Sequence, residues 1–107
     1  MKKYNVQITK EALKDMEEIY NYISDKLCAP QAALNQYNRI ADAILTLDYF
    51  PERNAILQSR YEYYKSIRRM VVGKYSVFYV INGDNVIAFC VLYSASDIEK
   101  RLKQRGI

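Results

Sequence analysis

The 107-residue sequence contains no histidine. This absence excludes catalysis by a serine–histidine or cysteine–histidine pair, and it removes the commonest metal ligand in proteins. A proton transfer would have to use a carboxyl, lysine, arginine or tyrosine group, none of which has an ordinary pKa near neutrality. An enzyme of this composition must therefore use displaced pKa values or electrostatic stabilisation.

Cysteine and long apolar runs are also scarce. Cys28 and Cys90 form no C-x-x-C spacing, so the sequence supports no zinc site, and we expect no metal or cofactor. We expect two free, packed thiols in a reducing compartment. No stretch approaches the roughly 20 apolar residues that span a bilayer, and a polar segment follows the N-terminal lysines where a signal peptide would be apolar. These features predict a cytoplasmic protein with no membrane partner.

What remains is a globular composition with an uneven charge. Half of the residues are hydrophobic and 26% are charged, which predicts one domain over residues 1–107. Residues 1–59 carry seven cations and eight acids, a net charge of −1, whereas residues 60–107 carry nine cations and four acids, a net charge of +5. A polyanion is therefore the first expectation for a partner of the second half.

The first half predicts a strand followed by two helices. "YNVQIT" alternates apolar and polar residues, as a half-buried strand does, and Thr9 can cap the helix that follows. Pro30 suits the start of a second helix, which we expect to end at "DYFPERNA". The first helix has an apolar stripe that runs on to Leu27 and is widened by Ile19, and we assign four of its residues to the core: Leu13, Met16, Tyr20 and Ile23.

The second half predicts three strands and a short helix. The strands are "YEYYKSIRRMVV", "KYSVFYVI" and "NVIAFCVLY", and Asn82-Gly83-Asp84 predicts a tight turn between the last two. The last strand is apolar on both faces, which is typical of a central strand covered on each side. "ASDIEKRLKQR" predicts a C-terminal helix. The order is β-α-α-β-β-β with a C-terminal helical segment, an α+β fold.

Basic residues interrupt the first of these three strands. Side chains alternate along a strand, so Arg68 and Arg69 should point to opposite faces and Lys65 should share a face with Arg69. Such cations could stabilise the negative charge that develops on a phosphate during RNA cleavage. The alternative is that they only cover an exposed face of the sheet.

Further candidates have the same two interpretations. Lys74 could assist the other cations, and Tyr79 and Tyr93 could stack on a base or donate a proton, although tyrosines are also common strand residues. The C-terminal cations are either a solvated helix end or a docking site for an acidic segment: Lys100, Arg101, Lys103 and Arg105.

The order of three phrases resembles the RelE/ParE superfamily of toxins from type II toxin–antitoxin modules, which includes plasmid stabilisation proteins. The phrases are "YNVQITKEALKDMEEIYNYI", "ILTLDYFPER" and "IRRMVVGKYSVFYVINGDNVIAFCVLYSASD", and they cover nearly the whole chain. The resemblance implies a compact sheet with a helical hairpin on one face of mainly antiparallel strands. It also implies a growth-arresting toxin neutralised by an antitoxin encoded beside it. RelE-like members cleave message on the ribosome, and ParE-like members inhibit DNA gyrase.

The resemblance also assigns candidate residues. Lys65, with Arg68 or Arg69, falls where RelE-like toxins place basic residues. Two positions depart from the nuclease pattern: Gly73-Lys74-Tyr75-Ser76 has serine where Gly-Tyr-Arg is common, and Ser94-Ala95-Ser96 replaces an arginine or histidine. The target-binding candidates are Arg60, Lys65, Arg68, Arg69 and Lys74, and the catalytic candidates are Lys65, Arg69, Tyr79 and Tyr93.

Two hypotheses remain open at this point. The first is a toxin, with either the ribosome and its message or gyrase as target, and the departures weigh against a complete nuclease site. In it, Lys65 and Arg69 would repel each other until an acidic antitoxin segment covered their face. The second is a non-toxic module that keeps the fold and binds nucleic acid or a protein.

Overall fold

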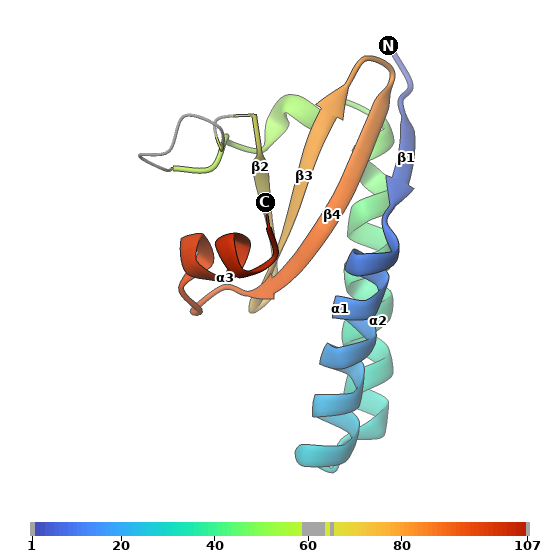
Figure 1. Ribbon diagram of the computed structural model, residues 1–107. Coiled ribbons are helices and arrows are strands. Elements are labelled where there is room, and N and C mark those ends of the chain that lie inside the picture. The colour runs from blue at the N-terminus through green and yellow to red at the C-terminus, as the bar shows by residue number, and fades with distance from the viewer. Residues whose placement is uncertain (1, 59–63, 65, 107) are drawn as a thin grey trace.

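A four-stranded sheet carries two helices on one face and a third helix on the other (Figure 1). The computed structural model describes residues 2–58, 64 and 66–106. The predicted α+β order is confirmed. Its elements are β1 (Asn5–Ile8), α1 (Lys10–Asn21), α2 (Pro30–Leu45), β2 (Arg68–Val72), β3 (Tyr75–Asn82), β4 (Asn85–Tyr93) and α3 (Ile98–Gln104). A π-helical turn, Tyr22–Lys26, continues α1, and two 3-10 turns follow α2, at Thr46–Asp48 and Pro51–Arg53.

The sheet has the strand order β1-β4-β3-β2. β1 runs parallel to β4, with Gln7 opposite Ile87, and the other two pairings are antiparallel. β4 is therefore a central strand, as its two apolar faces predicted. The turn between β3 and β4 is also confirmed, because Asn82 pairs with Asn85 and Gly83 has a φ of +60°, a conformation that glycine adopts at little cost.

β2 is shorter than the predicted strand. It begins at Arg68, and the expected residues 61–63 and 65 lie outside the described residues. The segment before it pairs with the outer edge of β2: the Leu57 amide donates to the Ile67 carbonyl over 2.7 Å, and the Arg69 amide donates to the Ala55 carbonyl over 3.1 Å. These bonds satisfy part of an edge that would otherwise be open to another chain.

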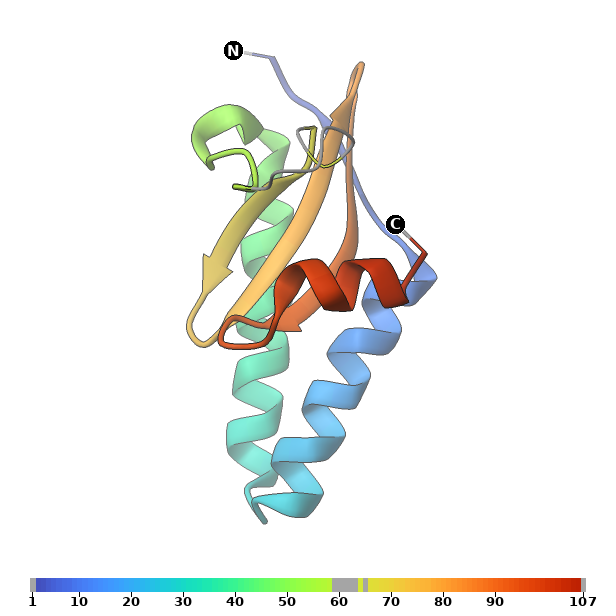
Figure 2. The same ribbon diagram turned by 60° about the vertical axis from the view of Figure 1, so that its left-hand side comes forward.

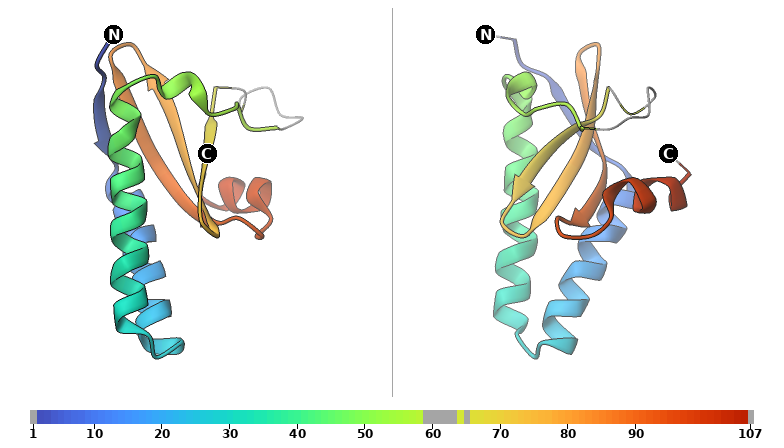
Figure 3. Two further views of the ribbon diagram at one scale, coloured as in Figure 1. Left: turned by 180° about the vertical axis from the view of Figure 1, so that it is seen from behind. Right: turned by 90° about the vertical axis from the view of Figure 1, so that its left-hand side faces the viewer.

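The α1–α2 hairpin covers one face of the sheet only in part. Thr9 caps α1 as predicted, since its hydroxyl accepts the Ala12 amide over 3.1 Å. The predicted core stripe of α1 is confirmed at Met16, which is buried, and wrong at Leu13, which is 42% exposed; Tyr20 and Ile23 are half-buried, and Leu27, at the far end of the stripe, is 57% exposed. The hairpin projects beyond the ends of the strands (Figure 1; Figure 3), so its distal residues have no sheet to cover. Ala12 and Met16 face the core in place of Leu13.

A second core lies on the opposite face, under α3. Figure 2 shows α3 crossing in front of the strands on the side away from α2. A β-bulge in β4 enlarges this face, because Phe78 pairs with Cys90 and Tyr79 with Ala88, which leaves Phe89 unpaired between them. The buried residues of this core are Leu57, Tyr64, Ile67, Phe78, Cys90, Leu92 and Leu102.

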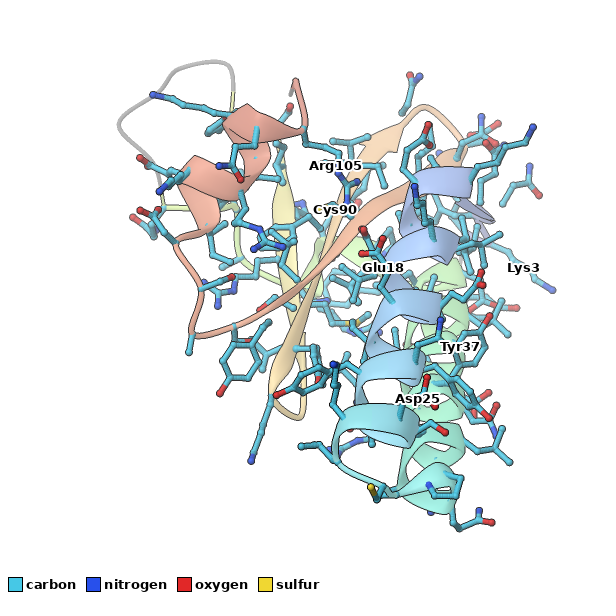
Figure 4. All side chains as sticks on the ribbon, turned by 60° about the horizontal axis from the view of Figure 1, so that its bottom comes forward. Lys3, Glu18, Asp25, Tyr37, Cys90 and Arg105 are labelled. Atoms are coloured by element: carbon cyan, nitrogen blue, oxygen red, sulfur yellow. The ribbon has the colours of Figure 1, made fainter. Side chains whose placement is uncertain are left out.

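The Asp15 carboxylate joins α1, β4 and α3. β1 pairs with β4 only as far as Ala88, and beyond that point Asp15 accepts the Val91 amide over 2.9 Å. Its other oxygen forms an ion pair with Arg105, which also donates to the Phe89 carbonyl over 3.4 Å. Figure 4 shows Arg105 beside Cys90, between α3 and α1. Arg105, expected to be a solvated or docking cation, is thus a structural group, and its hydrogen bond to Asp15 raises its pKa.

No described helix has both the length and the apolar character that crossing a membrane requires.

Asp15 provides a test of this joint. We expect Asp15→Asn to lower the free energy of unfolding by about 1–3 kcal/mol, because the Arg105 guanidinium would lose its charged partner. Urea denaturation measures the change. Glu18→Gln, one turn later and exposed, is the matched control and should stay within about 0.5 kcal/mol of the wild type. Equal stabilities of the two variants would contradict a structural role for the carboxylate.

Candidate functional site

Arg68 and Arg69 lie on opposite faces of the sheet, as predicted. The Arg68 guanidinium donates to the carbonyl oxygens of Glu52 over 3.2 Å and of Asn54 over 2.8 Å. It therefore holds the loop after α2 against β2. Both bonds start from one terminal nitrogen of the guanidinium and end on the backbone of this loop. Arg68 is also half-buried, so we assign it a structural role.

Arg69 belongs to a polar cluster with two serines. Its Nε donates to the Ser76 hydroxyl over 2.9 Å, and a terminal nitrogen donates to the Ser94 carbonyl over 3.4 Å. The two serine hydroxyls lie 2.7 Å apart, and the guanidinium carbon lies 5.9 Å from the centre of the Phe78 ring. We call this the Arg69–Ser76–Ser94 cluster. Ser76 and Ser94, two of the serines that depart from the nuclease pattern, are thus hydrogen-bonded to Arg69 of β2.

The face that carries Arg69 is not an open one. α3 and the segment before β2 cover it in part: Ser76 has no exposed surface, and Arg69 is half-buried. Lys65 lies outside the described residues, so its place on this face and its expected repulsion of Arg69 stay predictions, and the target-binding candidate Arg60 lies outside them too. Within the described part, the Arg69 guanidinium donates hydrogen bonds to Ser76 and Ser94.

The two candidate tyrosines have different surroundings. Tyr79 is fully buried; its hydroxyl donates to the Pro51 carbonyl over 2.5 Å and accepts from the Asn54 side chain over 3.1 Å. Because Tyr79 is buried, its ring cannot stack on a nucleobase. Burial also raises the pKa of Tyr79, which makes its hydroxyl a poorer proton donor. Tyr93 is half exposed and meets Tyr75 edge to face, with ring centres 5.9 Å apart.

Tyr93 and Lys74 line a groove between the projecting hairpin and the end of the sheet. The groove has a volume of about 600 Å³, which is within the usual size of a binding site. An adjoining hollow of about 380 Å³ continues between α1 and α3, and the two share Asp15, Glu18, Leu92 and Arg101. We call the pair the α1–α3 groove. Its main lining residues are Glu18, Tyr22, Lys74, Tyr75, Tyr93 and Arg101.

The charges of the α1–α3 groove are of both signs. Lys74 and Arg101 are exposed on the side of the sheet and α3, and Glu18 is exposed on α1. Figure 4 shows Glu18 on the side of α1 that faces α3. Among the described residues these three side chains have no ion-pair partner, whereas Asp15 is held by Arg105. In the described part of the chain no three carboxylate or cysteine groups could hold a metal ion.

The sequence did not predict this groove, although three of its lining residues were candidates. Lys74, Tyr93 and Arg101 were candidates, whereas Glu18, Tyr22 and Tyr75 were not. The available signal was the length of the apolar stripe, which runs on to Leu27, beyond what a short sheet can cover.

Comparison with known proteins gives a consistent family. A family model described as the ParE toxin of the type II toxin–antitoxin system parDE matches residues 6–98. No protein of curated function matches the sequence. Among solved structures, the chromosomal ParDE toxin–antitoxin system from P. aeruginosa superposes with a TM-score of 0.71 at 17% identity, covering 84% of this chain and 95% of that chain.

Two RelE–RelB complexes are also similar. The RelBE2 toxin–antitoxin complex from Mycobacterium tuberculosis has a TM-score of 0.61 at 19% identity, covering 90% of this chain and 97% of that chain. The archaeal RelE–RelB complex from Pyrococcus horikoshii OT3 has a TM-score of 0.57 at 19% identity, covering 87% and 97%. At such identities the similarity shows a shared fold.

The reactivity of the two cysteine thiols can test whether α3 stays packed on the sheet. Cys28 is exposed, contrary to our expectation of a packed thiol, while Cys90 is buried and burial raises its pKa to about 12. We expect a thiol reagent at pH 8 to label one cysteine per native chain rapidly and the second only in denaturant. Cys28→Ser should then show almost no rapid labelling. Rapid modification of Cys90 in the folded protein would mean that α3 does not stay on the sheet.

Proposed function

The chain belongs to the family of ParE toxins of type II toxin–antitoxin systems, and from this premise we propose that it arrests bacterial growth by binding DNA gyrase and is neutralised by a cognate antitoxin. The observation that carries the choice of target is the Arg69–Ser76–Ser94 cluster. In this cluster the arginine that a nuclease would direct at a phosphate donates hydrogen bonds to Ser76 and Ser94, and it is half-buried on a sheet face that α3 partly covers.

Message cleavage requires more than a basic surface. Attack by a ribose hydroxyl needs a group that activates the nucleophile, a group that stabilises charge on the phosphate, and a proton donor. Within the described residues Arg69 is engaged by two serines, and Tyr79 is buried with a raised pKa. Histidine is absent from the whole chain. A toxin that acts by binding needs none of these groups, which favours a protein target.

An antitoxin partner is supported by the neighbouring structures. Those from M. tuberculosis and P. horikoshii are complexes of a toxin with its antitoxin. The fold shared with them supports the same type of partner for this chain. The alternative function, a non-toxic binding module, predicts the same fold but no effect on growth.

Growth distinguishes the toxin from the binding module. Induced in bacteria without its neighbour, the protein should slow growth, and co-expression of the adjacent reading frame should restore it. Colony counts and optical density measure the effect, with immunoblotting to confirm soluble expression. Normal growth at good soluble expression would refute the proposal.

A second experiment separates gyrase from message. Purified protein should inhibit supercoiling of relaxed plasmid by gyrase, while message isolated after induction stays intact in primer extension. Arg69→Gln should lower the free energy of unfolding by about 1–2 kcal/mol, because it removes hydrogen bonds within the cluster, yet keep gyrase inhibition per folded molecule. If the wild type cleaves message within codons and Arg69→Gln abolishes this cleavage, the protein is instead a nuclease.

A further inference from the structure

The α1–α3 groove collects exposed apolar side chains from separate elements. Tyr22 of the π-helical turn is 56% exposed, Leu27 beyond it is 57% exposed, and Tyr93 at the end of β4 is 50% exposed. All three line the larger hollow. Large apolar side chains that converge on one concave surface are typical of an interaction site. The projection of the hairpin beyond the sheet creates this surface (Figure 3).

The charges of the groove determine which class of partner it suits. Lys74 and Arg101 present two cations on one wall, and Glu18 presents an unpaired carboxylate on the other. The adjoining hollow adds Glu11 and Lys14. A nucleic acid carries a phosphate at every nucleotide and would have to pass the carboxylates of α1, where it would be repelled. A protein segment can place a carboxylate and a cation at separate positions, so it matches a groove of mixed charge.

We propose that the α1–α3 groove is the binding site for a segment of the antitoxin. The segment presents a carboxylate to Lys74 and Arg101 and buries apolar side chains against Tyr22, Leu27 and Tyr93. This inference rests on the proposed function, because it takes the partner to be an antitoxin. It replaces the expectation that an acidic segment lies across the face of Arg69, since α3 and the segment before β2 already cover part of that face and Arg69 donates its hydrogen bonds within the chain.

A segment in this groove would contact both α1 and α3. These helices lie on either side of the groove, and the ion pair between Asp15 of α1 and Arg105, just beyond α3, lines its smaller hollow. Binding would therefore add contacts that hold α3 in place, and it would stabilise the folded chain by an amount that grows with antitoxin concentration.

Charge reversal on α3 tests the electrostatic part. The probe is the purified product of the reading frame adjacent to this one, and isothermal titration calorimetry measures its dissociation constant. Arg101→Glu should weaken binding at least tenfold, and Lys74→Glu should act in the same direction. Lys100→Glu, the same change at the exposed neighbouring residue outside the groove, is the matched control and should change binding less than threefold.

Ring removal tests the apolar part. Tyr22→Ala and Tyr93→Ala should each weaken antitoxin binding at least tenfold, whereas Tyr49→Ala should not, because Tyr49 is similarly exposed but lies outside the groove. Thermal unfolding confirms that each variant is folded.

The outcomes separate this inference from the proposed function. If the groove variants still arrest growth but are no longer rescued by the antitoxin, the inference holds. If they bind the antitoxin as the wild type does, or if a labelled single-stranded RNA binds the wild type and is lost in Arg101→Glu, the inference is wrong. A wild-type chain that never arrests growth refutes the proposed function, while the binding measurements on the variants still decide the role of the groove.

Discussion

The carboxylate of Asp15 is the constraint on which the arrangement of this fold depends. A buried ionised group costs several kcal/mol to desolvate, and it is tolerated only where partners surround it. Here the partners come from two other elements: the amide of Val91, on the stretch of β4 that β1 does not reach, and the guanidinium of Arg105, just beyond α3. One side chain of α1 thus fixes both the free edge of the central strand and the position of the last helix.

Two features of functional interest follow from that position. α3 covers part of the sheet face that carries Arg69, and on that face the half-buried guanidinium donates to the Ser76 hydroxyl and the Ser94 carbonyl. The same helix stands opposite α1 and forms the second wall of a groove that the sheet alone would not possess. The position of α3 thus has two effects: it covers part of the Arg69 face, and it forms one wall of the α1–α3 groove.

The sequence predicted those parts of the structure that local periodicity determines. Alternation and three- and four-residue spacing located the strands and helices, Thr9 and Pro30 marked helix starts, and Gly83 marked a turn, because each depends on neighbours within a few residues. The cluster of Arg69 with Ser94 and the contact of Asp15 with Arg105 join residues 25 and 90 positions apart, and no local pattern reports such pairs. Tyr79 could not be distinguished from an exposed strand tyrosine for the same reason. The exposure of Leu13 and Leu27 was missed because periodicity gives the face of a helix but not the extent of the sheet opposite it.

The parallel pairing of β1 with β4 also affects how the chain is made. β1 leaves the ribosome well before β4, because its pairing joins Asn5 to Asn85 and Ile8 to Ala88, and both helices of the hairpin lie between the two strands. At translation rates of about 5–20 residues per second, β1 and the helices that follow it wait for several seconds without the central strand. During that time the apolar side of α2 has no sheet to cover, and Asp15 has neither of its partners. A nascent chain interrupted before β4 therefore holds a helical hairpin and an unpaired strand, and only synthesis through β4 and α3 brings together the elements that form the groove.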